Sequence, residues 1–197
     1  VPVNFHTIEA INLVDQNLLT RVAMGDLYVR TTEYADTVQF SLTSTPNLYR
    51  TRINTQFFNL MATTKTIVYG RAGNDTIQQT NVTLPAEFYG EEDNDYLSSY
   101  TGNDLLVGGL GDDRLLGGAG ANELWGDNLA EQNLNVGGFD QISGGVGVDV
   151  AYGGSGNDII NLGGGNDYAF GGRGNDSLDG GDGNDRLYGG EGDDTIS

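Results

Sequence analysis

Residues 171–197 read GGRGNDSLD, GGDGNDRLY and GGEGDDTIS, which are three consecutive copies of one nine-residue unit. Each copy has glycine at its first, second and fourth positions, aspartate at the sixth and an aliphatic residue at the eighth. A fixed short period of this kind predicts a stacked repeat fold, in which each unit packs against its neighbours.

The same period extends toward the N-terminus as far as Asp95. The acidic position recurs at Asp95, Asp104, Asp113, Asp140, Asp149, Asp158, Asp167, Asp176, Asp185 and Asp194, with Asn122 and Glu131 in the two intervening slots. Two residues after each acidic position comes a mostly aliphatic column that runs from Leu97 to Ile196. We expect no insertion to break this register. A looser copy at residues 70–77 contains Asp75.

The unit has a direct physical interpretation. Glycines reach positive φ and allow a tight turn, and the last three residues form a short strand whose central side chain points inward. Two units then complete a coil of eighteen residues, and coils stack about 4.8 Å apart. Each acid therefore lies above the one eighteen positions earlier, where like charges repel unless a cation separates them. The sequence predicts an all-β parallel β-roll, a form of β-solenoid.

Composition restricts the cation and the partners. The formal net charge is −19, from 28 acidic and 9 basic residues, which excludes a protein that binds the phosphate backbone of nucleic acids. The absence of cysteine excludes thiolate metal sites. No apolar stretch is long enough for insertion into a membrane. Calcium accepts six to eight carboxylate and carbonyl oxygens in flexible geometry, so it is the expected ion.

The best copies read Gly-Gly-x-Gly-Asn-Asp-x-Leu-x, and the chain resembles the repeats-in-toxin (RTX) family of calcium-binding β-rolls. The resemblance implies ions between units n and n+2, held by their aspartates and by backbone carbonyls. Carried over, it pairs Asp95 with Asp113, Asp140 with Asp158, Asp149 with Asp167, Asp158 with Asp176, Asp167 with Asp185, and Asp176 with Asp194. The candidate calcium ligands are Asp75, Asp95, Asp104, Asp113, Asp140, Asp149, Asp158, Asp167, Asp176, Asp185 and Asp194, for about six or more Ca2+ ions.

One stretch departs from the unit. Asn122 and Glu131 replace aspartate, Leu129 stands where a turn glycine is expected, and Asn133 falls in the aliphatic column. We expect a degenerate, bulged loop near residues 127–135 and no calcium there.

Residues 1–69 lack the nonapeptide but alternate in a strand-like way, as in residues 26–30 and 36–40. We expect them to form longer, calcium-poor β-solenoid rungs that continue into the calcium-binding β-roll of residues 70–197. The alternative is a separate small β-sandwich.

Other chemistry finds little support in the sequence. His6 is the single histidine, and Lys65, the single lysine, does not follow any of the glycine-rich runs, so a Ser/His/Asp site and a phosphate loop are both excluded. Asp93-Asn94-Asp95 begins like an EF-hand loop, but Ser98 occupies the position of its turn glycine. The regular spacing of the carboxylates favours a shared ion over acid/base catalysis. We therefore expect that the protein is not an enzyme.

An outward-facing ladder is expected along one sheet, where every second unit ends in an apolar residue. Its members are Leu116, Leu134, Tyr152, Phe170 and Tyr188. The corresponding positions on the opposite sheet become polar toward the C-terminus: Val107, Trp125, Ser143, Asn161, Asp179 and Ser197. Such a ladder either stabilises its own sheet or forms a lateral contact with another chain.

The leading functional hypothesis is an extracellular calcium-binding structural protein of the matrix or cell surface. No capping unit is recognised, so we expect it to stack end to end into filaments. The alternative is a C-terminal folding and secretion module excised from a larger secreted toxin or hydrolase, and the weakest is an adhesin or carbohydrate-binding module. Low-affinity calcium sites and the family resemblance together imply a secreted protein, of bacterial origin.

Overall fold

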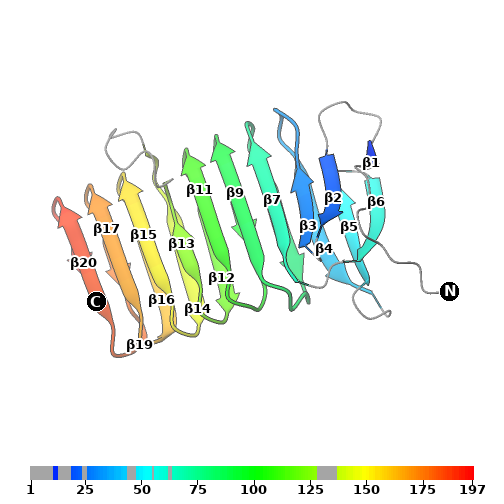
Figure 1. The fold of residues 1–197 in the computed structure, drawn as a ribbon. Helices are drawn as coiled ribbons and strands as arrows, with labels where there is room; N and C mark the ends of the chain where they lie inside the picture. Colours follow the sequence, from blue (N-terminus) through cyan, green and yellow to red (C-terminus); the bar gives the residue numbers. More distant parts are fainter. Residues whose placement is uncertain are drawn as a thin grey trace.

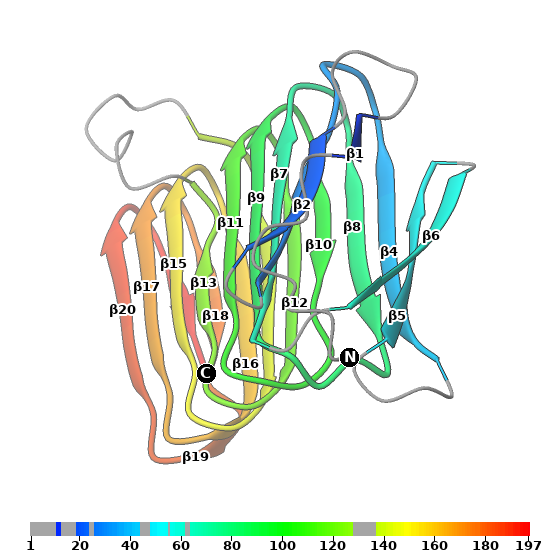
Figure 2. The same ribbon diagram turned by 45° about the vertical axis from the view of Figure 1, so that its right-hand side comes forward.

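The computed structural model describes residues 11–12, 19–23, 26–43, 48–54, 56–61, 64–127 and 137–197. All of the regular structure in these ranges is β-strand, arranged in two facing sheets (Figures 1 and 2). The ten-stranded sheet contains, in spatial order, β1 (Ile11–Asn12), β2 (Leu19–Ala23), β3 (Asp26–Arg30), β7 (Thr66–Arg71), β9 (Ala86–Glu92), β11 (Leu105–Leu110), β13 (Glu123–Trp125), β15 (Val150–Ser155), β17 (Tyr168–Arg173) and β20 (Arg186–Glu191).

The second sheet has eleven strands. In spatial order these are β21 (Thr195–Ile196), β18 (Ser177–Asp179), β16 (Ile159–Gly165), β14 (Gln141–Val146), β12 (Arg114–Ala119), β10 (Tyr96–Ser98), β8 (Thr76–Thr80), β4 (Thr37–Leu42), β5 (Leu48–Ile53) and β6 (Gln56–Met61), with β19 (Asp182–Gly183) paired beside β16. From β7 onward the chain alternates between the two sheets, and every pairing is parallel.

The coil length agrees with the repeat. Val150 of β15 pairs with Tyr168 of β17, and Tyr168 pairs with Arg186 of β20, so both of these steps along the sheet are eighteen residues. The predicted all-β parallel β-solenoid is therefore confirmed.

The core is the aliphatic column that the repeat predicts. Because side chains alternate along a strand, the eighth residue of each unit points between the sheets while its two neighbours point outward. Leu97, Leu106, Leu115 and Leu124 are each 0 % exposed, and further along the column Ile160 is 1 % exposed. The column thus forms a narrow apolar interior that runs along the axis of the coil.

In the nonapeptide region, where an uninterrupted period was predicted, the register breaks once. Before that region the steps from β7 to β9 and from β8 to β10 are 20 residues. Arg114 of β12 pairs with Gln141 of β14, and Glu123 of β13 pairs with Val150 of β15, so both steps are 27 residues instead of eighteen. One nine-residue unit is therefore extra to the coil. The bulge expected at 127–135 falls mostly outside the described residues, since the chain is described up to Asp127 and again from Gly137.

This shift also corrects the outer ladder. Leu116 pairs with Ser143 and thus lies on the eleven-stranded sheet, not in line with Tyr152. Trp125 pairs with Tyr152 and takes the predicted place of Leu134, which lies outside the described residues. The rings of Trp125, Tyr152, Phe170 and Tyr188 stack in succession, with centroids 3.8, 5.0 and 5.1 Å apart.

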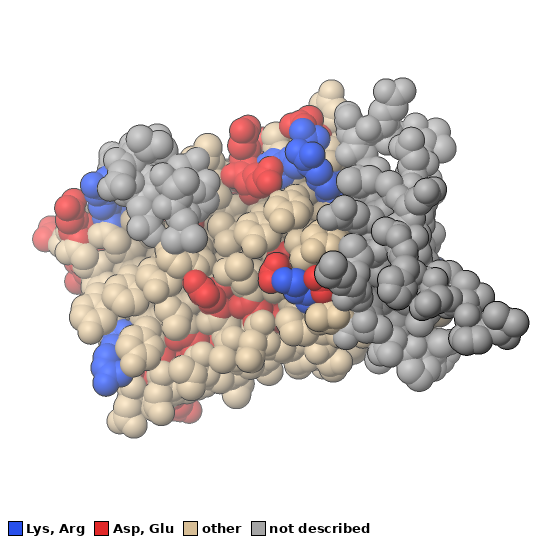
Figure 3. Space-filling model, in the orientation of Figure 1, with Lys and Arg blue, Asp and Glu red and all other residues tan. Residues whose placement is uncertain are grey.

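Figure 3 views the face of the ten-stranded sheet, where uncharged side chains cover much of the surface. A shallow pocket of about 500 Å³ lies beside the stacked rings and is lined by residues that include Trp125, Tyr152, Phe170 and Arg173.

The N-terminal strands extend both sheets. β3 pairs in parallel with β7, and β4 pairs in parallel with β8, so residues 26–42 provide strands of the same solenoid. Beyond them the pairing becomes antiparallel, between β2 and β3, β4 and β5, and β5 and β6. This antiparallel edge is not foreseen by the repeat. The division of the chain at residue 69 stays a prediction, and His6 lies outside the described residues.

Candidate metal centre

The chain turns from one sheet to the other along two flanks of the coil (Figure 2), and the repeat aspartates belong to these turns. We call the turns that lead from the ten-stranded to the eleven-stranded sheet the aspartate flank. Its acids are Asp75, Asp95, Asp113, Asp140, Asp158, Asp176 and Asp194. We call the turns that lead back the mixed flank, where the corresponding positions are Thr66, Ala86, Asp104, Asn122, Asp149, Asp167 and Asp185.

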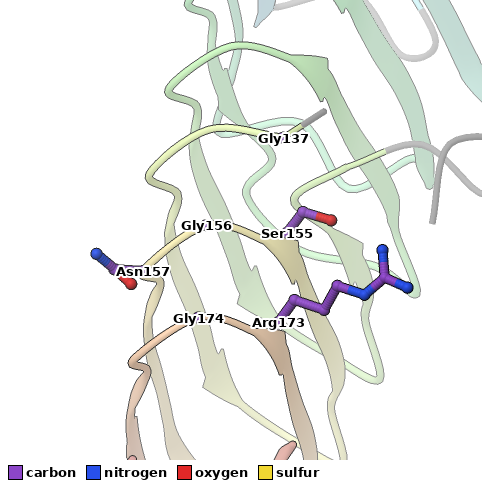
Figure 4. A pocket seen from close by; sticks show the side chains of 6 residues that line it. All are labelled: Gly137, Ser155, Gly156, Asn157, Arg173 and Gly174. Atoms are coloured by element: carbon purple, nitrogen blue, oxygen red, sulfur yellow. The ribbon is translucent and has the colours of Figure 1, made fainter. Parts of the chain in front are cut away.

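Glycine makes these turns possible. Gly156 and Gly174 occupy the same place on successive turns of the aspartate flank (Figure 4) and have φ values of +136° and +125°. Residues other than glycine rarely adopt this backbone conformation. A Cβ on Gly174 would also overlap the carbonyl oxygen of Gly156 on the adjacent coil. Ser155 and Arg173 extend from the same turns and line a pocket of about 280 Å³ (Figure 4).

One oxygen of each aspartate fixes the stacking of the coils. Oδ1 accepts a hydrogen bond from the backbone N–H of the residue one coil earlier, for example from Asp95 to Asp113 at 2.7 Å and from Asp149 to Asp167 at 2.8 Å. On the aspartate flank these bonds link Asp75 to Asp95, Asp95 to Asp113, Asp113 to Asp140, Asp140 to Asp158, Asp158 to Asp176, and Asp176 to Asp194. On the mixed flank they link Asp149 to Asp167 and Asp167 to Asp185.

The structure therefore brings together all six of the predicted aspartate pairs. It adds Asp75 with Asp95, and Asp113 with Asp140. Neither pair could be found from an eighteen-residue spacing, because 20 and 27 residues, respectively, separate their members.

The second oxygen of these aspartates is buried without a partner. Within the described part of the chain, Oδ2 has no hydrogen bond in Asp75, Asp95, Asp104, Asp113, Asp140, Asp149, Asp158, Asp167 and Asp176. Each of these side chains is at most 3 % exposed. Leaving a carboxylate oxygen buried and unpaired costs on the order of several kcal/mol of folding free energy. Asp185 and Asp194, at the end of the described coils, are partly exposed.

A backbone carbonyl from the next coil lies beside the unpaired oxygen of Asp75, Asp95, Asp113, Asp140, Asp149, Asp158 and Asp176. The point where a Cβ would stand on Gly70 is 2.5 Å from Asp75 Oδ2 and 2.6 Å from the carbonyl oxygen of Gly90. The corresponding point on Gly144 is 2.6 Å from Asp149 Oδ2 and 2.8 Å from the carbonyl oxygen of Leu162. Two electron-rich oxygens thus converge at each of these seven turns, where glycine leaves room beside them.

These surroundings make the charged form of the carboxyl unfavourable. Burial, together with the nearby charges of Asp158 and Asp113, raises the pKa of Asp140 to about 9, although a backbone hydrogen bond acts to lower it. For the same principal reason, the pKa of Asp113 is raised to about 8 and that of Asp95 to about 7. An ion of opposite charge would reverse this preference.

The donor set fits calcium. Carboxylate and carbonyl oxygens are its usual ligands, and it tolerates irregular geometry. In the part of the chain that the structure describes, no three carboxylate or imidazole side chains converge on one point, so most ligands would have to be carbonyls.

Two further buried acids were not predicted as site residues. Asp36, which lies on the aspartate flank before Asp75, is signalled by the echo of residues 35–38 in residues 74–77. Asp127, 2 % exposed, accepts a hydrogen bond from the backbone N–H of Ser155 and has no counterpart in the repeat pattern.

Comparison with known families agrees with this geometry. Four copies of the RTX calcium-binding nonapeptide repeat match the chain, at residues 67–78, 89–124, 136–169 and 163–196. The chain belongs to this family of RTX repeat proteins, whose repeats form β-rolls and bind calcium ions. The repeat forms a structural, calcium-binding domain, proteins with such repeats are typically secreted by bacteria, and the match indicates no enzyme family. No curated protein matches the chain. The described residues contain no helix suited to crossing a membrane.

Proposed function

We propose that this protein is an extracellular structural roll whose coils are held together by calcium, and that it does not act as an enzyme. The ions lie between aspartates one coil apart, with Oδ2 and the facing carbonyl among their ligands. The proposed ligands are Asp75, Asp95, Asp113, Asp140, Asp149, Asp158, Asp167, Asp176, Asp185 and Asp194. Six or more ions per chain agree with the number of such pairs.

The repeated unpaired Oδ2 atom carries this proposal. An isolated buried carboxylate would be an anomaly, but eight of the proposed ligands are buried with the same unpaired atom, which indicates a shared cation. Calcium would neutralise the charge and bridge the coils, and its binding free energy would then become folding free energy. Sites of this type fill at extracellular calcium levels when their affinity is low.

Calcium removal tests the proposal together with a matched pair of variants. In Asp158→Asn, a buried ligand to both neighbouring coils loses its charge, whereas Asp179→Asn changes an exposed acid at the end of β18. Losing one site that is filled at 100 times its Kd costs about 2.7 kcal/mol. We expect Asp158→Asn to bind fewer ions and to melt at lower temperature in calcium, with Asp179→Asn close to wild type. A circular dichroism spectrum unchanged by chelator would exclude the proposal.

We further propose that the roll assembles end to end in the matrix or at the cell surface. β20 and β21 each have a strand neighbour on one side, and Tyr188 and Ile196 are 53 % and 51 % exposed. A second copy stacked on these strands would continue both sheets and cover these side chains. Electron micrographs and sedimentation at millimolar calcium should show filaments. Monomers alone would favour the alternative, a calcium-triggered folding module of a larger secreted protein, which the same buried carboxylates support.

A further inference from the structure

The two flanks of the roll differ in the residues that occupy their turns and in the hydrogen bonds that those residues make. On the aspartate flank, every acid from Asp75 to Asp176 has an unpaired Oδ2. On the mixed flank, the first positions are Thr66 and Ala86, followed by Asp104 and Asn122, before the aspartates resume at Asp149.

In its turn, Asn122 forms hydrogen bonds to the polar backbone groups through its own side-chain amide. Its Oδ1 accepts a hydrogen bond from the backbone N–H of Asp104 at 3.2 Å, as the aspartates do elsewhere. Its Nδ2 occupies the place of Oδ2 and donates to the carbonyl oxygens of Gly144 and Gly120, each at 3.4 Å. The amide thus donates to a carbonyl that would otherwise be a metal ligand, and its nitrogen cannot bind a cation.

Internal donors also occupy the preceding turns of the mixed flank. Ser99, at a position where most units have glycine, donates from Oγ to the carbonyl oxygen of Gly117 at 2.5 Å. One coil earlier, Gln79 Nε2 donates to Thr66 Oγ1 at 2.6 Å, both groups being buried. Asp104 Oδ2 is unpaired like that of the other buried aspartates, but Asp104 lies between Ala86 and Asn122 and so faces no carboxylate on either adjacent coil.

The first turn of the aspartate flank supports the same distinction. Asp36 Oδ2 accepts hydrogen bonds from the backbone N–H and the hydroxyl of Thr32, both at 2.7 Å, and its Oδ1 accepts one from Asn54 Nδ2. Thr31 donates its hydroxyl to the carbonyl of Gly70. Here all of the oxygens are paired with protein donors, in contrast to Asp75 on the next coil.

We propose that calcium binds on only one flank of the coils between residues 66 and 125 and on both flanks of those between residues 140 and 194. Gln79, Ser99 and Asn122 replace the ions on the mixed flank of the earlier coils. Asp104 is accordingly not a calcium ligand, unlike the expectation from its place in the repeat. This inference rests on the proposed function, since it concerns which of the repeat turns take the ion.

The hydrogen-bonded turns of the mixed flank should make the earlier coils less dependent on calcium than the later ones. The earlier coils keep one hydrogen-bonded flank when calcium is removed, whereas the later coils lose the ions on both flanks. Hydrogen exchange during a calcium titration should therefore show residues 141–196 losing protection at higher calcium concentrations than residues 66–80 and 96–125.

The variant Asn122→Asp tests the assignment directly. It restores a carboxylate next to Asp104 and Asp149, and should bind at least one more calcium ion per chain than wild type, measured by equilibrium dialysis. Asn122→Ala removes the amide without adding charge and should gain no ion. An Asn122→Asp chain that folds in calcium and binds only the wild-type number of ions would overturn the inference.

Anomalous scattering from wild-type crystals grown in calcium gives a second measurement that does not depend on a variant folding. We expect ions along the aspartate flank from Asp75 onward, and along the mixed flank only from Asp149 onward. An ion bound to Asp104 or to Asn122 Oδ1 would contradict the inference. Wild-type protein that binds no calcium at all would instead contradict the proposed function.

Discussion

The two oxygens of each repeat aspartate have separate tasks in this roll. Oδ1 fixes the turn by accepting a backbone hydrogen bond from the previous coil, as in Asp158 to Asp176 at 2.8 Å. Oδ2 is turned inward and stays unpaired in the chain alone. An amide can accept the stacking hydrogen bond but cannot offer a second oxygen to a cation. For this reason Asn122 keeps the bond between coils, while its Nδ2 donates to the carbonyl oxygen of Gly144.

Substitutions of a turn glycine, Gly156, and of a glycine near the end of β16, Gly164, should differ sharply in effect. Gly156 has φ of +136°, and a Cβ there would overlap the carbonyl oxygen of Gly138. The nearest atom to a Cβ on Gly164 is Asp182 Cβ, 4.0 Å away, and its φ is not in the left-handed region. We expect Gly156→Ala to destabilise the calcium-loaded roll by at least about 1–3 kcal/mol, and Gly164→Ala to change stability little. Denaturant unfolding measures both, and equal effects would contradict this account of the turn.

At the scale of strands, the stacked rings of the ten-stranded sheet distinguish its outer face from that of the other sheet. The rings of Tyr152, Phe170 and Tyr188 are within 8° of parallel with their neighbours. The rings lie face to face with one another, so the ladder is better suited to fixing strand register than to stacking a flat ligand between the rings. Only the last ring, Tyr188, is more than half exposed.

Phe170→Ala should remove two ring contacts at once. Each aromatic pair contributes roughly 0.5–1.5 kcal/mol beyond buried area, so we expect a loss of about 1–3 kcal/mol in the free energy of unfolding. Asn161→Ala, at the matched outward position of β16, is the control and should have a small effect. If both variants melt alike, the ladder does not stabilise the sheet.

The parallel coils and their inner column were predictable because every unit repeats the same inward aliphatic position, as at Leu106 and Leu115. The break near Asp127 was not, for a physical reason. The extra segment has the length of one unit, so the nine-residue period continues beyond it unchanged. It nevertheless exchanges the sheets to which the units before and after it belong, relative to strict alternation. Trp125 and Leu116 were consequently predicted on the wrong sheets. The antiparallel strands β5 and β6 carry no repeat and gave no such signal.

For the whole molecule, the buried carboxyls predict opposite effects of pH with and without calcium. Burial raises the pKa of Asp140 to about 9 and that of Asp75 to about 8 in the metal-free roll, above the value of about 3.9 in an unfolded chain. The folded state then binds more protons than the unfolded state across this window. Stability without calcium is therefore greatest at low pH and falls as pH rises toward 8 or 9.

Chelated protein should accordingly gain β-structure, by circular dichroism, when the pH is lowered from 8 to about 5. In excess calcium the same change should lower the melting temperature, because protons compete with the ion for the carboxylates. The pH is kept above the isoelectric point of about 4.1, and sedimentation monitors aggregation. A metal-free chain whose structure is insensitive to pH would contradict the raised pKa values.

The step of 27 residues in both sheets also bears on how such a chain can be edited. Because Gln141 and Val150 regain their partners after nine surplus residues, removing residues 128–136 should leave each later strand facing the neighbour it already has. The position between Asp127 and Gly137 is thus suited to the insertion of a foreign peptide, which would be displayed at one flank of the roll without changing which strands pair.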